Sequence, residues 1–408
     1  MKTQEETRLL KEHTKSLCPE CFDVIEAQVV EENGCVFLKK SCALHGSFSV
    51  IIEKDPSLYK ALYNKEYIPR SFPFANLSLS VSHKCNLNCP VCYVSPLGQE
   101  DNALEDLRAK IKNFQGKMIL LTGGEPTLRD DLLEIIKFTR LQGKVPVLIT
   151  NGVKLADARY VKALKEAGLA WVHFSFNGFH DTIYRKINGQ PLYAAKMKAL
   201  KNLKRTGLKT ALSLLYAKGI NEKEISRVFR FCLKNHSFIR QFRIRAITKN
   251  GCYLPSDTIF LSELVEKFGE VIGLDKTKIV DFALRCNYDN HHERRTDPMP
   301  CHLEFDVALF LERYIAGNVF TKLKKRKLIM KWFVTRFGIL DTINIVWEYF
   351  VRARGRFSFS VKLRSWTDKQ RIDLGEMQHC LSAYSLRSDG GMLPFCQAIV
   401  LNEKHSHI

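Results

Sequence analysis

The sequence lacks an apolar run long enough to cross a membrane. Its longest apolar stretch, around residues 338–351, is interrupted by Asp341, Asn344 and Glu348, whereas a spanning helix needs roughly 18 consecutive apolar residues. The opening residues MKTQEETRLLKEHTK contain neither the apolar core nor the small-residue cleavage site of a secretion signal. We therefore expect a cytoplasmic protein without a transmembrane helix.

Acidic residues are scarce relative to basic ones. The 408 residues contain 43 Asp and Glu against 63 Lys and Arg, a formal net charge of +20. Such an excess bears on partners and solubility rather than on fold, and it predicts an acidic partner. Between Asn318 and Arg371 there are fourteen Lys and Arg against three acids. The apolar content of 45% excludes wholesale disorder.

The pattern along the chain divides it into three parts. A cysteine-rich module occupies residues 1–70, an alternating strand and helix region occupies 71–250, and a less regular, α-rich domain occupies 251–408. In the middle part, short β-rich runs are predicted as strands and the amphipathic runs between them as helices. The six predicted strands are 77–82, 118–122, 147–150, 171–176, 210–216 and 242–247. Repeated βα units predict an α/β fold, a partial (β/α)6 TIM-like barrel whose working face lies at the strand carboxyl ends. A doubly wound sheet is the alternative.

Four residues of the first module have metal-ligand spacing. Cys18 and Cys21 are separated by two residues, as are Cys42 and His45. Thiolate and imidazole in two such pairs predict one tetrahedral site for mononuclear Zn or Fe, and the alternative is a set of unliganded side chains.

Three cysteines follow the first barrel strand within eight residues. Cys85, Cys89 and Cys92 form the run CNLNCPVC, and a loop with this spacing can wrap one small cluster. Because cubane clusters usually have four thiolates, three would leave one iron open to another ligand. A zinc knuckle with a distant fourth ligand is the alternative.

A glycine-rich turn follows the next predicted strand. Gly123, Gly124, Glu125 and Pro126 lie where the second strand ends, so we expect them on the same face as the cysteine loop. Glycine lets backbone come close to a ligand, and the Glu125 carboxylate can accept a hydrogen bond from an ammonium group. An ordinary strand-to-helix turn would also explain the motif.

Together, the cysteine run and the Gly-Gly-Glu segment resemble the radical S-adenosylmethionine (SAM) superfamily across residues 77–247. The resemblance implies a [4Fe-4S] cluster on Cys85, Cys89 and Cys92, with SAM chelating the fourth iron. It also implies that one electron from ferredoxin or flavodoxin cleaves SAM to a 5′-deoxyadenosyl radical, which abstracts hydrogen from substrate. Glu125 would hold the methionine ammonium. The other residues implied to contact SAM are Thr150, Asn151, Ser175, Asn177 and Arg185, although Asn-Gly pairs are also common in turns.

The C-terminal cysteines allow two interpretations. Cys301, Cys380 and Cys396 lie in irregular segments, two of them beside prolines, and they are candidates for an auxiliary [4Fe-4S] cluster. Incidental thiols are the alternative, since no Cys-x2-Cys pair occurs here.

The order of motifs along the chain is the N-terminal Cys-x2-Cys and Cys-x2-His pairs, the central cysteine run, a Pro-Cys-His segment and a Pro-Phe-Cys segment. This order is similar to that of the class D methyltransferase and tetraether lipid synthase-like group. This resemblance implies alkylation or coupling of an unactivated carbon in a pterin-like or lipid-like substrate. A peptide-modifying or cofactor-biosynthesis enzyme is a second hypothesis, and a non-catalytic metal-binding membrane adaptor is a third.

The basic segment 322–334 combines cations with large apolar side chains. A positive amphipathic helix suits peripheral contact with an anionic membrane surface, whereas a nucleic-acid patch would not need so many apolar groups. A solvated helix with one buried face explains much of the same pattern, and nucleic acid is the least favoured partner.

Overall fold

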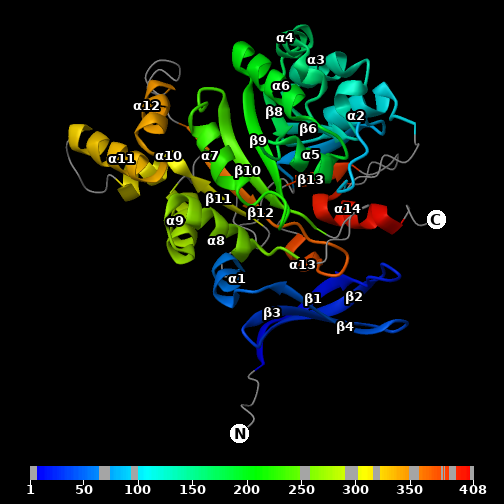
Figure 1. Ribbon diagram of the computed structural model, residues 1–408. Helices are drawn as coiled ribbons and strands as arrows, with labels where there is room; N and C mark the ends of the chain where they lie inside the picture. Colours follow the sequence, from blue (N-terminus) through cyan, green and yellow to red (C-terminus); the bar gives the residue numbers. More distant parts are fainter. Residues whose placement is uncertain are drawn as a thin grey trace.

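The computed structural model describes residues 7–63, 74–92, 100–248, 258–289, 302–315, 322–348, 358–377, 380, 382–385 and 392–404. Two β-sheets organise these residues, and Figure 1 shows the smaller sheet below the larger one, with α13 (Leu374–Met377) between them.

The smaller sheet is an antiparallel meander. Its strands are β1 (Arg8–Leu17), β2 (Val24–Glu32), β3 (Cys35–Cys42) and β4 (Gly46–Glu53), hydrogen-bonded in that order. A two-residue turn joins β2 to β3, and Asn33 and Gly34 both have positive φ there, as a tight hairpin turn requires. Helix α1 (Pro56–Tyr63) packs Tyr59 against Val36 and Leu38 of the sheet. The module is thus a small sheet with its own core.

Six parallel strands form the centre of the larger sheet. They are β5 (Asn76–Ser82), β6 (Met118–Gly123), β7 (Val145–Thr150), β8 (Trp171–Ser175), β9 (Lys209–Tyr216) and β10 (Ile239–Ala246). Because they are neighbours in chain order, the barrel-like winding is confirmed over the doubly wound alternative.

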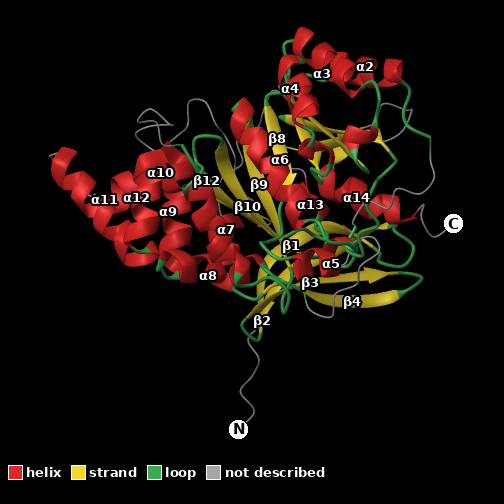
Figure 2. Ribbon diagram, turned by 45° about the horizontal axis from the view of Figure 1, so that its top comes forward, coloured by secondary structure: helices red, strands yellow, loops and turns green. Residues whose placement is uncertain are grey.

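Helices cover the outer face of this sheet (Figure 2). Those predicted between the strands are observed as α2 (Leu104–Asn113), α3 (Leu132–Leu141), α4 (Ala158–Glu166), α6 (Tyr193–Thr206) and α7 (Glu224–Leu233). Helix α5 (Asp181–Asn188), which follows β8, was not predicted, nor were the short 3-10 turns Pro126–Leu128 and Lys154–Ala156.

The C-terminal part adds strands to both edges of the barrel sheet. Beyond β10 lie β12 (Ser360–Arg364), parallel to β10, and then antiparallel β11 (His302–Asp306). Beyond β5 lie β13 (Ser382–Ser385) and β14 (Met392–Pro394). This part therefore contributes to the sheet as well as helices. The helices are α8 (Leu261–Ile272), α9 (Lys276–Asp289), α10 (Val307–Phe310), α11 (Lys322–Phe337), α12 (Ile339–Trp347) and α14 (Phe395–Lys404), with a π-helical turn at Leu311–Ile315.

Side chains alternate between the two faces of the barrel strands. Outward positions such as Leu79, Leu121 and Phe242 are fully buried in one core with the helices. Inward positions carry more polar groups, including Ser80, Thr122 and His173, which the strand registers align across β5, β6 and β8. A strand exposes successive side chains to opposite faces, so this alternation makes the inside of the barrel polar.

Candidate active site

The three central cysteines lie in one loop at the carboxyl end of β5. The Cys92 amide donates to the Cys89 carbonyl at 3.1 Å, which makes a tight turn between these two residues. All three side chains are half-buried, and Leu87 packs against Tyr184 and Leu192 beneath the loop. Burial raises the pKa of the Cys85 and Cys89 thiols, which is the expected effect on a group that loses water.

The glycine-rich turn after β6 is hydrogen-bonded to the start of this loop. The Gly124 amide donates to the Ser82 carbonyl and the Glu125 amide to the Lys84 carbonyl, both at 2.7 Å. A Cβ atom at Gly123 would lie 2.2 Å from the Ser82 oxygen, and one at Gly124 would lie 2.3 Å from the Lys84 oxygen. The backbone of the cysteine loop therefore leaves no room for a side chain at these two positions. From sequence, the glycines were expected to make room for a ligand instead.

Glu125 is the polar centre of the site. Its side chain is completely buried, and Oε1 accepts hydrogen bonds from the Thr127 amide at 3.1 Å, the Thr127 hydroxyl at 2.6 Å and the Thr150 hydroxyl at 2.7 Å. Oε2 accepts from the Asn151 amide at 2.7 Å. A carboxylate acts only as an acceptor and has about four lone-pair sites, so Oε2 retains capacity for a cationic ligand.

A chain of amide side chains links the ends of β8 and α5 to Cys89. Asn177 donates to Asn188 at 3.1 Å, and Asn188 donates to the Cys89 sulfur at 3.3 Å. Asn177 also accepts from the Leu215 amide at 3.0 Å. On the other side of the loop, Asn151 donates to Asn86 at 2.8 Å. The loop is thus hydrogen-bonded directly to the residue after β7 and to α5, and through α5 to the segment after β8.

Lys196 is a component of the site that sequence reasoning missed. It is fully buried on α6, and its ammonium donates to the carbonyls of Asn151 and, at 2.7 Å, Ser175. Burial lowers its pKa to about 8, although Glu125 and Cys89 oppose that effect. Lys196 therefore connects the backbone after β7 to the end of β8, where two of the predicted SAM-binding segments lie.

The structure brings together most of the predicted site residues but not all. The cysteine loop, Glu125, Thr150, Asn151 and Asn177 form one hydrogen-bonded group, and Ser175 joins it through its carbonyl. Arg185 lies exposed on α5, and no contact recorded for the described residues joins it to this group. Its role toward SAM stays a prediction.

The donor set at the cysteine loop fits a [4Fe-4S] cluster. Three thiols are available on one loop, and the Asn188 amide and the Lys196 charge both favour the thiolate form of Cys89, which is the form that binds iron. Beside it, the buried Glu125 carboxylate fits the ammonium of an amino acid. These residues would hold the cluster and SAM.

The four N-terminal metal candidates converge at one end of the small sheet. Their ligand atoms all lie within 4.8 Å of one another. The His45 Nδ1 lies 3.6 Å from the Cys18 sulfur and 3.5 Å from the Cys42 sulfur, and the Cys21 and Cys42 sulfurs are 3.9 Å apart. The His45 contact lowers the pKa of Cys42 to about 6. Three thiols and one imidazole within this distance fit a tetrahedral Zn or Fe site.

Two of the three C-terminal cysteines, Cys380 and Cys396, are among the described residues. Cys380 and Cys396 are buried in one apolar cluster with Trp366 and Leu17, and burial raises the pKa of Cys396. Cys301 lies outside the described residues. The auxiliary cluster therefore stays a prediction.

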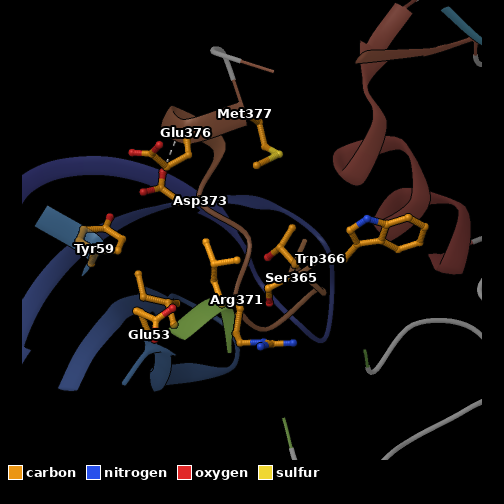
Figure 3. A pocket seen from close by; sticks show the side chains of 11 residues that line it. Glu53, Tyr59, Ser365, Trp366, Arg371, Asp373, Glu376 and Met377 are labelled. Carbon is orange, nitrogen blue, oxygen red and sulfur yellow. Dashed lines mark hydrogen bonds between the residues drawn. The ribbon is translucent and has the colours of Figure 1, made fainter. Parts of the chain in front are cut away.

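A pocket of about 80 Å³ lies between the small sheet and the C-terminal segment (Figure 3). Glu53, Tyr59, Trp366 and Arg371 are among the residues that line it. None of its lining residues belongs to the cysteine loop or to the turn around Glu125, so this pocket is separate from the predicted SAM site.

Comparisons with known proteins agree with this geometry. Residues 79–232 match the profile of the radical SAM superfamily, and residues 10–54 match the HMPTM N-terminal zinc ribbon domain. A 7,8-dihydro-6-hydroxymethylpterin dimethyltransferase from Methanocaldococcus jannaschii is 30% identical over 274 residues, which are 59% of this chain and 54% of that protein. A probable GTP 3′,8-cyclase from Pyrococcus abyssi is 31% identical over 177 residues, 42% of this chain and 57% of that protein.

The chain thus spans about half the length of these curated relatives. Among solved structures, Streptococcus suis SuiB bound to its precursor peptide SuiA aligns with a TM-score of 0.44 and 19% identity, covering 49% of this chain and 46% of that one. Residues 79–232 thus match the radical SAM superfamily, and the segment that precedes them matches a zinc ribbon domain.

Proposed function

We propose that this protein cleaves SAM reductively and uses the resulting radical to alkylate or couple an unactivated carbon of a pterin-like or lipid-like substrate. The observation that supports the proposal most directly is the pair of backbone hydrogen bonds from Gly124 and Glu125 to the cysteine loop. They hold three thiols and a buried carboxylate side by side at the carboxyl ends of adjacent parallel strands, where barrel enzymes bind their substrates.

The bound cluster and SAM supply a single chemical capability, formation of a 5′-deoxyadenosyl radical after transfer of one electron. The chain's residues bind and orient. In this proposal, the Oε2 atom of Glu125 holds the methionine ammonium. The Thr127 and Thr150 hydroxyls donate to the other oxygen of Glu125 and so fix the Glu125 carboxylate. Asn188 and Lys196 stabilise the Cys89 thiolate. Such positioning, together with exclusion of water, is what a protein contributes to cofactor chemistry.

The substrate class rests on the pterin dimethyltransferase similarity and on the zinc ribbon in front of the barrel. A cofactor-biosynthesis or peptide-modifying reaction is the second candidate, and the similarity to a probable GTP 3′,8-cyclase favours its cofactor-biosynthesis form. The three cysteines Cys85, Cys89 and Cys92, retained beside the buried Glu125 carboxylate, count against a non-catalytic adaptor. We take ferredoxin or flavodoxin as the reductant.

The test is SAM cleavage by the anaerobically reconstituted protein. With dithionite, the wild type is expected to release 5′-deoxyadenosine, measured by liquid chromatography and mass spectrometry. Simultaneous Cys85→Ser, Cys89→Ser and Cys92→Ser changes should abolish it, because they remove the thiolates that bind the cluster.

The matched control is Cys35→Ser, a half-buried cysteine in the zinc ribbon that is not among the four converging ligands. This variant should cleave SAM as the wild type does. Wild-type protein with a full complement of iron and sulfide that releases no 5′-deoxyadenosine would contradict the proposed function and favour the adaptor.

We also propose peripheral contact with an anionic lipid surface through α11 and α12. The exposed side chains of α12 include Ile339, Leu340, Ile343 and Trp347, which are 66, 78, 56 and 62% exposed. Lys324, Arg326 and Lys327 are exposed on α11, and α11 packs against α12. Both views place these helices on the side of the molecule away from α14 (Figures 1 and 2). Exposed apolar groups beside cations suit insertion among anionic headgroups.

A further inference from the structure

The inner face of β10 and β12 carries a row of cations. Arg243 pairs with Lys362 and Arg245 pairs with Arg364 in the parallel register of these strands. The residues between them, such as Ile244, are fully buried on the outer, helix-covered face. Because successive side chains of a strand point to opposite faces, the four cations share the inner face. Figure 2 shows the two strands side by side.

Three of these cations, Arg243, Arg245 and Lys362, act electrostatically on His173 of β8, two strands away from β10. The Arg243 guanidinium lies 2.6 Å from the His173 Nδ1. Burial first, and then the charges of Arg243, Arg245 and Lys362, lower the pKa of His173 well below its usual range. The imidazole is therefore neutral and accepts a hydrogen bond from Arg243. Three positive charges thus act on one half-buried imidazole on the inner face of the barrel.

An aromatic side chain orients two of the guanidinium groups. The Trp366 ring lies 5.2 Å from Arg245 and 5.4 Å from Arg364, distances typical of cation–π contacts. Trp366 follows the carboxyl end of β12, the end at which the active-site loops of a barrel gather. The cations are thus held at the inner face and near the mouth of the barrel.

Among the described residues, few acidic side chains lie on this face of the sheet. Glu304 of β11 lies 3.8 Å from Lys362 and accepts hydrogen bonds from Gln241 and Ser360. Asp306 of the same strand accepts a hydrogen bond from the Leu309 amide and makes a further interaction with the chain. All four cations make further interactions with the chain, so an incoming anion would join an existing network. Like charges held this close repel one another, and a bound anion would relieve that repulsion.

From this geometry we infer a subsite for a phosphate group of the substrate, bound by Arg245 and Arg364 and supported by Arg243 and Lys362. The inference rests on the proposed function, because it takes the barrel interior as the substrate site. Arginine is well suited to the role, since its planar guanidinium can donate two parallel hydrogen bonds to phosphate oxygens. The substrate would therefore be a phosphate ester rather than a neutral ring compound.

The experiment measures pyrophosphate binding to the reconstituted full-length protein by isothermal titration calorimetry at fixed ionic strength. Arg245→Gln with Arg364→Gln should weaken binding by about tenfold or more, the usual consequence of losing charge-assisted hydrogen bonds. The control, Lys162→Gln with Lys165→Gln at exposed positions of α4, removes the same charge and should bind as the wild type does. Equal weakening by both pairs would overturn the inference, because binding would then follow net charge alone.

Arg245→Lys with Arg364→Lys keeps the charge and guards against misfolding of the glutamine pair. It should bind more tightly than the glutamine pair and more weakly than the wild type. Titrations with glycerol phosphate and with short-chain phosphatidylglycerol then tell a soluble phosphate ester from a lipid headgroup, and failure of both to bind would also overturn the inference. SAM cleavage by the wild type is a separate readout. Its absence with pyrophosphate binding intact would contradict the proposed function alone.

Discussion

At the scale of single residues, the hydrogen bonds to Glu125 decide how well the site can bind a cation. Thr150 donates to Oε1 and accepts from the Gly152 amide at 2.8 Å. We expect Thr150→Val to lower the free energy of unfolding by about 1–3 kcal/mol, because it leaves a buried carboxylate with one donor fewer. It should also weaken SAM binding, since the carboxylate is then held less firmly. Urea unfolding and equilibrium dialysis with labelled SAM measure the two effects.

Thr139→Val is the matched control. Thr139 is also fully buried, but its hydroxyl donates to the Ile135 carbonyl within α3, away from the site. Its loss should leave SAM affinity unchanged. If both variants weakened SAM binding equally, the effect of Thr150 would reflect general destabilisation.

The residues predicted from sequence were those that form local motifs. The cysteine run and the Gly-Gly-Glu turn are recognisable by spacing, whereas Lys196 resembles any lysine of a basic helix. A signal existed, because Lys196 stands three, four and seven positions before Ala199, Leu200 and Leu203, all on the buried stripe of α6. A lysine in that stripe needs buried partners. Arg185 stays an untested prediction, since residue type and a nearby motif do not reveal the direction of a side chain on a helix.

At the scale of elements, the contact between the zinc ribbon and α13 contains a buried acidic cluster. Lys11 of β1 lies 3.2 Å from Asp373 and 3.3 Å from Glu376. Burial raises the pKa of Glu376 to about 7, and Asp373 adds to that effect while Lys11 opposes it. A carboxyl group with a raised pKa in the folded protein favours folding at low pH. That advantage is lost as the pH rises from the ordinary value near 4.5 through 7.

Glu376→Gln should therefore stabilise the protein above pH 7. The expected gain at pH 8 is about 1–3 kcal/mol, because each tenfold change in a protonation equilibrium corresponds to about 1.4 kcal/mol, and the gain should shrink toward pH 5.5. Urea unfolding at both pH values with zinc present measures it. Glu270→Gln, at an exposed position on α8, should change stability little at either pH. A gain that did not depend on pH would count against ionisation of Glu376 as the cause.

The strands of the barrel were predictable because each is a short apolar run followed by a glycine-punctuated helix. All six were found within a few residues of their observed bounds. The strands β11 to β14 were not predicted: β12 and β13 pair with barrel strands that are distant in sequence, and β13 and β14 are only four and three residues long. β12 pairs with β10 across more than one hundred residues, and Lys362 and Arg364 interrupt its apolar pattern. Because Lys362 and Arg364 point inward, the sequence of β12 did not read as an apolar run, although its outer face is apolar.

At the scale of the whole molecule, α11 carries seven Lys and Arg and no acid, and it packs against α12, whose apolar side chains are exposed. Among the residues that the structure describes, none of the helices has the length and apolarity needed to cross a bilayer. The proposed contact of α11 and α12 with lipid depends on both charge and apolar insertion.

Flotation with liposomes that contain phosphatidylglycerol separates these contributions. Charge reversal of Lys324, Lys325, Arg326 and Lys327 to Glu should abolish flotation of the full-length protein, because it replaces attraction to the headgroups by repulsion. Reversal of four lysines exposed on α4 and α6, Lys162, Lys165, Lys198 and Lys201, changes the net charge equally and should leave flotation intact. Leu340→Asp should weaken flotation without altering net charge by more than one. Equal flotation of the wild type and the α11 variant would remove the membrane proposal, since the cations beside the apolar face would then have no part in it.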